Sequence, residues 1–591
     1  MDIAVDAYLR LTPTYCPVGG AAHSHACSRG AKSSFLPVVR RLSLVTFVAL
    51  LLAAITEGQT RPIYETSPQT AISPVELAEL PAPQALRDYV SQGKLQLTLD
   101  DAIRLALLNN PDLQIEQSKV AEARYDVLSA YHPFDPAVIS GFNVLRSNSA
   151  SFNQLAGSSS VTVPLTSAGL SSLFQTGQFS YSQTFQTGTN YQVSFFGSKS
   201  NTSGAVPSNP YYYSTLNFSI TQPLLRNRGH FPNRAPIVIA QRNLEQSRDN
   251  FKAQVSDFIQ AAVSQYWNVV LARESLKVAR DSLRAAEATY QQDKRALQLG
   301  ALPPLDIYRS ESEVAQRRVL AIQMEYTLKQ VEENFRHVIG ADLDPYIDAL
   351  DLDLVENPEP SGELLTIDAS TALRQAIDGR PELEALLQTI ANDETSIRLA
   401  HNSLLPDLEL SGVYSSTGLG GGQFTPVGLQ AGVINGGFGE SLGQLFHFRY
   451  PTYGFALTLN LPVRDRAVEA QLGKARVARR TDLYQLRKQR AGIMLEVMNA
   501  VHQLEQAKLS LEAAKVALDL AEKTRQAEQR KYELGAGQIF LVLEAQTELS
   551  QAKVAVVQGE VNYHLSVTTV EHATGTLLKH YQIQIAGSSA F

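Results

Sequence analysis

Residues 297–311 read LQLGALPPLDIYRSE and interrupt a stretch that otherwise has the periodicity of one long helix. Gly300 and the pair Pro303 and Pro304 predict that the helix stops there, because glycine favours a helix end and proline cannot continue a helix. A near-copy, YELGAGQIFLVLEAQ, occupies residues 532–546. The same break in two places predicts two matched helix reversals rather than a flaw in one helix.

The sequence around the two breaks is duplicated. Residues 269–340 align with residues 504–575 without a gap, and in both copies Leu and Ala recur at alternating spacings of four and three. This spacing is typical of a coiled-coil seam. A second pair, DAIRLALLNNPDL (101–113) and TALRQAIDGRPEL (371–383), opens each copy. The sequence therefore predicts two tandem structural repeats, although a soluble coiled-coil rod would explain the seam taken alone.

Each copy also contains strand-like sequence. LNFSIT (216–221) and YGFALTLNL (453–461) alternate clearly between apolar and polar residues, whereas AVISGFNVL (137–145) and DLELSGVYS (407–415) alternate more weakly. Period-two alternation predicts strands with two unlike faces. A half-buried sheet of a soluble protein and a lipid-facing sheet both give this pattern.

The segment 147–210 is rich in Ser, Gly, Asn, Thr and aromatic residues, and we expect long exposed loops that hold an extra hairpin around FSYSQTFQTGTNYQVSFF. The tyrosines at 211–213 fit either a membrane interface or a surface aromatic patch. The clear strands end near matched prolines, Pro223 and Pro462. Because proline cannot donate to a strand ladder, we expect these prolines to mark the turns from strand to helix.

Geometry connects the helices and the strands. A helix over 233–298 would be about 100 Å long at 1.5 Å per residue, while the return helix, 305–340, reaches about half as far. The opening helix, 98–131, has the missing length, so the two short helices could flank the long one. Four antiparallel strands from one chain cannot close a barrel. Several protomers must therefore share one.

The N-terminus has the composition of an export signal. Arg40 and Arg41 precede a fourteen-residue apolar run, 42–55, and a small polar stretch follows. Both cysteines, Cys16 and Cys27, lie upstream of that run, so a processed chain would hold no disulfide and no thiolate zinc site. Removal of residues 1–59 takes away five basic and three acidic residues, which leaves 46 basic and 55 acidic residues and a net charge of −9. This charge disfavours a nucleic-acid partner.

Enzyme signatures are weak. Gly473 and Lys474 lack the upstream glycine of a phosphate-binding loop, since position 468 is valine. The run GLGGGQ (418–423) predicts a surface loop rather than a phosphate cradle. The acidic stretch 342–368 predicts a solvated linker and lacks the spacing of an EF-hand calcium site. We therefore expect no catalytic residue, no cofactor and no metal site.

The sequence resembles the TolC-like outer-membrane efflux protein family over residues 97–576. The resemblance rests on the order and duplication of several motifs, namely NNP (109–111) and GRP (379–381), TQPLLRNRG (221–229), the two LGA breaks, and the ends VIG (338–340) and ATG (573–575). It implies an α+β membrane protein, a homotrimer whose protomers each give about four strands to a shared β-barrel. A long coiled-coil α-helical barrel would continue that β-barrel through the periplasm.

The resemblance also implies roles at the helix tips. The tips would contact a periplasmic adaptor (membrane fusion) protein through two matched triplets, Leu299, Gly300, Ala301 and Leu534, Gly535, Ala536. Asp306 and Tyr532 match positions that form a gating link, and Glu544 matches one member of an acidic ring. The second ring position is Leu541 here, and a basic partner of the link corresponds to Gly537. The double acidic ring of the family is therefore incomplete in this sequence.

The resemblance implies an outer-membrane exit duct of a tripartite efflux or type I secretion system, working with outer-membrane lipid, the adaptor and an inner-membrane pump. The alternative is an exported structural or adhesive coiled-coil protein with a soluble β-domain. We expect the chain to divide into an N-terminal extension with signal peptide (1–59), an N-terminal periplasmic segment (60–96), a first repeat (97–341), an acidic equatorial linker (342–368), a second repeat (369–576) and a C-terminal tail (577–591).

Overall fold

The computed structural model describes residues 85–91, 93–151, 168–203, 208–299, 304–423, 434–534 and 536–583. All of them belong to one unit, Pro81–Phe591. The expected export signal and both cysteines lie outside the described residues, as do Gly300, Ala301 and Gly535 of the LGA breaks.

The opening helix expected over 98–131 is two helices, α2 (Leu99–Asn109) and α3 (Pro111–Ser129). The chain is extended at Asn110, because the proline that follows disfavours a helical conformation at the residue before it. The Asn110 side chain then caps α3 by accepting the backbone N–H of Asp112 at 2.8 Å. The second copy has the same arrangement, with α7 (Ala369–Gly379) and α8 (Pro381–Ser403) separated at Arg380. The prediction of a single opening helix was therefore wrong.

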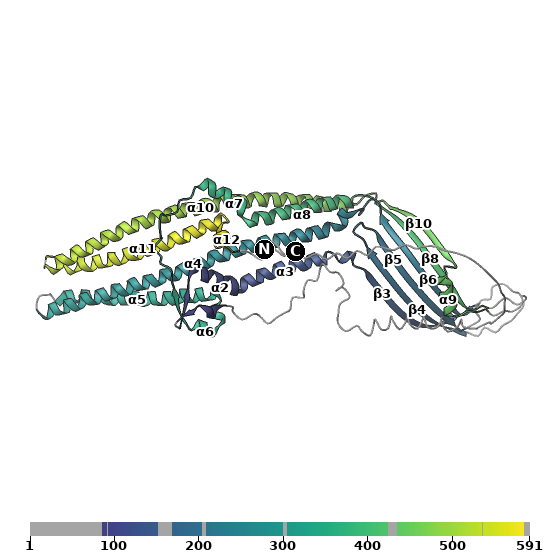
Figure 1. Ribbon diagram of the computed structural model, residues 1–591, viewed down its shortest axis with the longest axis horizontal. Helices are drawn as coiled ribbons and strands as arrows, with labels where there is room; N and C mark the ends of the chain where they lie inside the picture. Colours follow the sequence, from purple (N-terminus) through teal and green to yellow (C-terminus); the bar gives the residue numbers. More distant parts are fainter. Residues whose placement is uncertain are drawn as a thin grey trace, which may run out of the picture. The chain divides into compact units, whose positions relative to one another are not determined.

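The long helices and their return helices agree with the prediction. α4 (His230–Gln298) contains 69 residues, about 100 Å at 1.5 Å per residue, and α5 (Pro304–Ile339) returns along it. α10 (Arg466–Glu533) and α11 (Ile539–Ala573) form the equivalent hairpin. Figure 1 shows the two hairpins side by side, with α3 along α4 and α8 along both α4 and α10. The short helices thus flank the long ones end to end, as expected.

Buried alanines and leucines hold these helices together, and they are the residues of the predicted seam. On α4 the buried set includes Ala272, Leu276 and Ala279, and on α10 it includes Leu504, Ala507 and Leu511. Small residues at alternate seam positions let the helix backbones approach closely. The seam is therefore a packing surface within one chain.

The main sheet is larger than predicted. In the described part of the chain its order is β10-β8-β6-β5-β4-β3, and all of these neighbours are antiparallel. The short β9 pairs with β8 outside this path. The strands are β3 (Ala137–Ser151), β4 (Ala168–Thr184), β5 (Asn190–Thr202), β6 (Ser208–Pro223), β8 (Asp407–Gln423), β9 (Ile434–Asn435) and β10 (Pro451–Asn460).

Two predictions about the sheet were wrong. The hairpin expected around residues 179–196 is present as β4–β5, but it is not part of exposed loops, because β4 pairs with β3 and β5 pairs with β6 along most of their lengths. The protomer therefore gives the sheet six long strands instead of four, counted over the described residues. The run 418–423 is not a surface loop either. It forms the end of β8 and pairs with β6.

The two faces of the sheet differ in polarity. Leu216, Phe218 and Ile220 on β6 share one face with Phe455 and Leu457 on β10, as the strand registers require. Ser, Thr and Asn occupy most of the alternate positions. β6 ends at Pro223, and Pro462 lies between β10 and α10, so each proline stands near a passage from strand to long helix.

A second, three-stranded sheet lies beside the helices. β1 (Val90–Ser91) pairs with β2 (Lys94–Leu97), and β2 pairs in parallel with β7 (Asp351–Leu354). Leu352 and Leu354 of β7 are buried. The expectation of a wholly solvated linker over 342–368 was therefore wrong, because alternate apolar residues anchor its middle to the core.

The remaining elements of the described residues are short. They are η1 (Leu86–Tyr89), η2 (His132–Phe134), η3 (Ala341–Leu343), α6 (Pro345–Asp348), α9 (Phe438–Phe446) and α12 (Leu577–His580). Within the described ranges, the helices are all too short or too polar to span a bilayer.

Candidate functional site at the helix tips

The two helical hairpins end in matched, exposed leucines. The Leu299 side chain is 84% exposed and that of Leu534 is 83% exposed, although both are large and apolar. Each backbone N–H still bonds to the helix, Leu299 to Arg295 and Leu534 to Arg530 at 3.1 Å. The leucines therefore close their helices while their side chains remain free of the core.

The turn between α10 and α11 is tight. The backbone N–H of Ala536 donates to the carbonyl of Lys531 at 2.9 Å. A Cβ on Gly537 would lie 2.9 Å from the backbone nitrogen of Tyr532. Only glycine fits this turn without a shift of the backbone. The absence of a basic side chain at position 537 thus has a steric reason.

Tyr532 joins the two hairpins, but through a different residue from the one predicted. Its hydroxyl donates to Asp293 Oδ1 at 2.8 Å, and Ser310 Oγ donates to the other oxygen of the same carboxylate. Asp293 and Ser310 are fully buried, on α4 and α5 respectively. Burial and the hydrogen bond to Asp293 raise the pKa of Tyr532 above its ordinary value. The phenol therefore keeps its proton and acts as a donor at neutral pH.

Asp306 lies near this bond without taking part in it. Its carboxylate is 3.9 Å from Arg309 on the same helix. Its negative charge adds to the rise in the pKa of Tyr532. Since a phenol has one proton to donate, the predicted direct link from Tyr532 to Asp306 is replaced by the link to Asp293.

Asp293 could have been recognised from the sequence. It follows the buried seam residue Ala286 by one heptad, at a position where the seam predicts an apolar side chain. Ser310, one helix away, gives no comparable signal.

A groove of 790 Å³ runs between α5 and α11 next to the tips. Leu305, Tyr308 and Phe540 line it, and all three side chains are more than half exposed. Glu544 lines the same groove together with Arg309. The structure thus brings Glu544 to a groove beside the tips, whereas the ring described above would require copies from several protomers.

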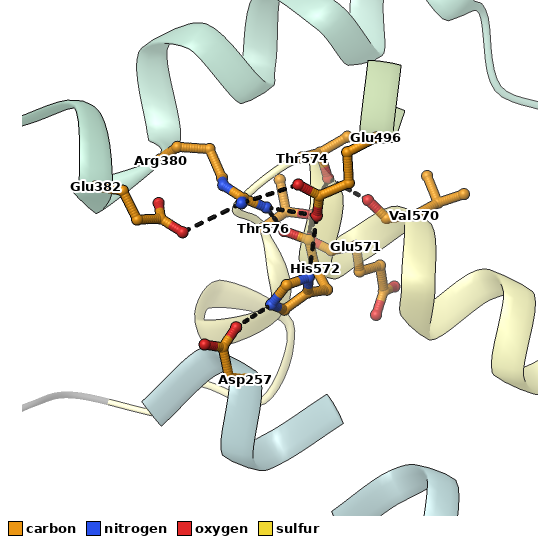
Figure 2. Close-up of polar contacts among 9 residues, drawn as sticks. All are labelled: Asp257, Arg380, Glu382, Glu496, Val570, Glu571, His572, Thr574 and Thr576. Atoms are coloured by element: carbon orange, nitrogen blue, oxygen red, sulfur yellow. Dashed lines mark hydrogen bonds and ion pairs between the residues drawn. The ribbon is translucent and has the colours of Figure 1, made fainter. Parts of the chain in front are cut away.

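A network of charged groups connects the first half of the chain to the second, far along the helices from the tips. Figure 2 shows Arg380 between Glu382 and Glu496, and His572 between Glu496 and Asp257. Arg380 contacts both oxygens of Glu496, at 2.9 and 3.1 Å. His572 Nε2 lies 2.7 Å from Asp257 Oδ1, and its Nδ1 lies 3.5 Å from Glu496 Oε1.

The network sets the protonation of its members. Burial alone would lower the pKa of His572, but its hydrogen bonds to Asp257 and Glu496 outweigh burial and raise this pKa to about 9. The bond from His572, together with Arg380, lowers the pKa of Glu496 despite its partial burial. His572 is therefore a cation and Glu496 an anion at neutral pH. His572 joins α11 to α10 through Glu496 and to α4 through Asp257.

The duplicated motifs meet in space in matched pairs. Gly340 has φ of 72°, and a Cβ on it would lie 2.7 Å from Cβ of Asn109. Gly575 has φ of 69°, and a Cβ on it would lie 2.9 Å from the carbonyl oxygen of Gly379. The return helix of each half thus ends against the break between that half's two opening helices. Both contacts require glycine.

Comparison with known proteins agrees with this geometry. The family model described as "Outer membrane efflux protein" matches residues 190–341 and 372–576, more than half of the chain. The chain belongs to this family. No curated protein sequence matches this efflux protein.

Solved structures of outer-membrane channels share the fold. The transmembrane channel protein CusC is 15% identical, with a TM-score of 0.58 and coverage of 84% of this chain and 96% of that chain. The outer membrane channel CmeC of Campylobacter jejuni is 14% identical, with a TM-score of 0.55 and coverage of 88% and 94%. The outer membrane protein VceC of Vibrio cholerae is 13% identical, with a TM-score of 0.55 and coverage of 81% and 96%.

The family fixes the location of this efflux protein. It resides in the outer membrane and carries a periplasmic helical extension. The resemblance stated from the sequence is confirmed. The tip residues belong to the end of the helices farthest from the sheet, because α4 and α10 start at the strands and end at Leu299 and Leu534.

Proposed function

We propose that three copies of the chain form an exit duct that passively conducts cargo from an inner-membrane pump and an adaptor through the periplasm and the outer membrane. The observation that carries this proposal is the direct continuation of a two-faced sheet into paired long helices, twice in one chain of an efflux family. α4 follows β6, and α10 follows β10, after short turns. Each of the two tandem repeats would then contribute strands to the wall of the β-barrel and helices to the wall of the periplasmic tube.

The edges of the sheet support a shared barrel. Within the described residues, β3 and β10 stand at the two ends of the strand order, each with a free side. Unpaired strand edges are costly in a membrane, where no water satisfies the backbone. Pairing β10 of one protomer with β3 of the next would satisfy both edges. With the six long strands of the described residues in each protomer, a trimer would have about eighteen, a size at which barrels enclose a water-filled channel.

The exposed apolar side chains argue against the alternative of a soluble β-domain. Phe142, Tyr453 and Phe455 are each more than 70% exposed in the protomer, and all lie on the apolar face of the sheet. Such a face has no cover in a soluble protein, whereas lipid would cover it. The chain has the parts of a conduit, so we assign it no catalysis.

The adaptor contact belongs to the tips in this proposal. Leu299, Gly300, Ala301 and their matches Leu534, Gly535 and Ala536 would meet the adaptor, with the groove between α5 and α11 as an adjoining surface. Leu299→Asp combined with Leu534→Asp is expected to abolish co-purification of the native adaptor. Leu343→Asp, which changes an exposed leucine on η3, is the matched control and is expected to leave it intact. Equal loss in both variants would contradict the assignment.

The duct itself is tested by extraction and conductance. Protein from the native membrane is expected to extract with mild detergent as a trimer and to form channels in planar bilayers. Monomeric protein that dissolves in buffer without detergent would favour the coiled-coil protein with a soluble β-domain.

A further inference from the structure

The short helix α9 is held against the main sheet by packing and by hydrogen bonds. It packs against β8 and β6, and its Leu445 is fully buried. Ser441 on α9 forms a hydrogen bond of 2.6 Å with Ser214 of β6 and donates to the carbonyl of Gly418 at 2.8 Å. Ser416 donates to the carbonyl of Leu445 at 2.9 Å. These bonds fix the helix against the strands.

Glycines make room for this helix. A Cβ on Gly418 would overlap the carbonyl oxygen of Ser441, and one on Gly420 would lie 2.5 Å from the carbonyl oxygen of Gly437. A Cβ on Gly197 of β5 would press on the ring of Phe438 at 3.3 Å. The glycines at the end of β8 therefore leave the space that α9 occupies.

α9 lies on the apolar face of the sheet. Ser214 shares its face with Leu216, Phe218 and Ile220, because side chains alternate along a strand. Ser214 is opposite Gly418 in the register, so the glycine-rich end of β8 under α9 belongs to the same face of the sheet. In the proposed duct this face meets lipid, and the inference that follows rests on that proposed function.

The height of α9 corresponds to a membrane boundary. From Pro223, where β6 meets the helices, Ser214 is about nine residues away, or about 30 Å along the strand. With the strand tilt of about 40° that barrels adopt, this is about 23 Å of height. The apolar band of such barrels is about 25 Å tall. If the band begins at Pro223, α9 lies at the edge of the band farthest from the periplasmic helices.

Aromatic and basic side chains gather at the same level. Lys199 of β5 lies over the ring of Tyr212 at 5.8 Å, and that ring contacts Phe438 at a centroid distance of 6.1 Å. Arg449, just after α9, lies over the ring of Tyr450 at 5.8 Å. Phe446 is 60% exposed at the end of α9. An apolar, aromatic helix flanked by cations is typical of a segment that lies in a membrane interface.

We propose that α9 is a lipid-docking helix in the outer leaflet of the membrane, with Phe446 among the acyl chains and Lys199 and Arg449 toward the phosphates of anionic lipid. A second copy of the chain is a poorer occupant. α9 rests on strands in the middle of the sheet, whereas neighbouring protomers would join at β3 and β10.

Depth-dependent fluorescence quenching tests the position of α9. The chain has one tryptophan, the buried Trp267 on α4, which serves as a constant background. Full-length Phe446→Trp protein in phosphatidylcholine vesicles is expected to be quenched most by lipids brominated near the headgroup. Phe455→Trp, on the apolar face of β10, is expected to be quenched most by lipids brominated deep in the chains.

The outcomes separate the two proposals. Quenching of Phe455→Trp without quenching of Phe446→Trp would overturn the docking helix and leave the duct intact. If acrylamide in water also fails to reach Phe446→Trp, protein covers α9, which overturns lipid as its occupant. Absence of bromolipid quenching at both positions would contradict the duct itself.

The cations are tested with lipid A, a phosphate-bearing lipid. Addition of lipid A to the detergent-solubilised protein is expected to raise its Tm, and the double variant Lys199→Gln with Arg449→Gln is expected to lose about half of that rise or more. Arg480→Gln is the matched control, because Arg480 lies over the ring of Tyr484 at 5.7 Å on α10, away from the sheet. An equal rise in Tm in the unmodified protein and in every variant would overturn the assignment of Lys199 and Arg449 to lipid phosphates. An equal loss of that rise in the double variant and in Arg480→Gln would overturn it as well.

Discussion

The hydroxyl of Tyr532 donates to Asp293 across 2.8 Å and so joins α10 to α4, which lie in different halves of the chain. Asp293 is fully buried, and its other oxygen accepts from Ser310. One carboxylate thus holds three helices together next to the exposed tips. This bond must break before the two helical hairpins can separate, so it can act as a latch at the periplasmic end of the duct. We expect this bond to keep the resting duct closed.

Tyr532→Phe is therefore expected to raise the resting conductance of the duct in planar bilayers. Hydrogen bonds to charged groups contribute about 1.5–3 kcal/mol, so the ratio of open to closed channels should rise by about tenfold to a hundredfold. Asp293→Asn is expected to act in the same direction, because the amide is a weaker acceptor than the carboxylate.

A double-mutant cycle identifies the partner of Tyr532. The effects of Tyr532→Phe and Asp293→Asn should not add, because one change removes and the other weakens the same bond. The effects of Tyr532→Phe and Asp306→Ala should nearly add. The reverse result would restore Asp306 as the partner and contradict the link found in the structure. Unchanged conductance in every variant would mean that the bond is no latch.

His572 is expected to make the helical part of the protein less stable in mild alkali. Its pKa is raised from 6.5 to about 9 in the folded protein, so it binds a proton more tightly when folded. The stability that this provides is fully present below pH 6.5 and is lost as pH rises through about 9. The shift corresponds to at most about 3 kcal/mol. Thermal unfolding followed by circular dichroism between pH 6.5 and 9.5 measures it.

Substitution separates His572 from other titrating groups. His572→Gln should be less stable at pH 6.5 and should lose most of the decline between pH 6.5 and 9.5. His337→Gln is the matched control, because His337 is exposed and pairs with Asp342 on the surface. An equal alkaline decline in His572→Gln and the unmodified protein would show that another group causes it.

The extra hairpin β4–β5 is expected to widen the duct. Barrel diameter grows roughly linearly with strand number, so reducing about eighteen strands to about twelve should reduce the cross-section to roughly half. The variant replaces residues 152–207 with an Asn-Gly turn, so that β3 leads directly into β6. In a background opened by Tyr532→Phe, its single-channel conductance should fall to roughly half.

Assembly must be checked in this hairpin variant. A trimer in mild detergent with reduced conductance would agree with a wall of six strands per protomer. A trimer with unchanged conductance would show that the hairpin does not line the duct. Loss of the trimer would show instead that the hairpin is needed for the protomers to join.

The sequence predicted the long elements because their signals are local and repeated. The breaks at 297–311 and 532–546 and the alternation of Leu and Ala follow from helix periodicity alone. The Tyr532 link was predicted with the wrong acceptor, because the acceptor depends on how α4 and α10 are rotated against each other. That rotation is set by packing along the whole seam.

The glycine-rich stretch misled for a related reason. The run 418–423 has the composition of a loop, yet it forms the end of β8 because α9 needs the space that glycine leaves. α9 itself contains Gly439 and Gly443, which lower its helix propensity. The strand conformation of 418–423 and the helical conformation of α9 therefore depend on each other. Single-sequence patterns cannot detect such mutual dependence.

Gly575→Ala is expected to destabilise the helical part, because the residue has φ of 69° and faces the carbonyl of Gly379. A left-handed conformation costs a non-glycine residue about 1–2 kcal/mol, and the contact adds to that cost. Gly473→Ala is the matched control. It lies inside α10, nothing lies within 4 Å of its added Cβ, and alanine there should stabilise the protein by up to about 1 kcal/mol. Thermal unfolding should therefore shift in opposite directions for these two identical substitutions, and a shift in the same direction would contradict the packing of the ATG end against the GRP break.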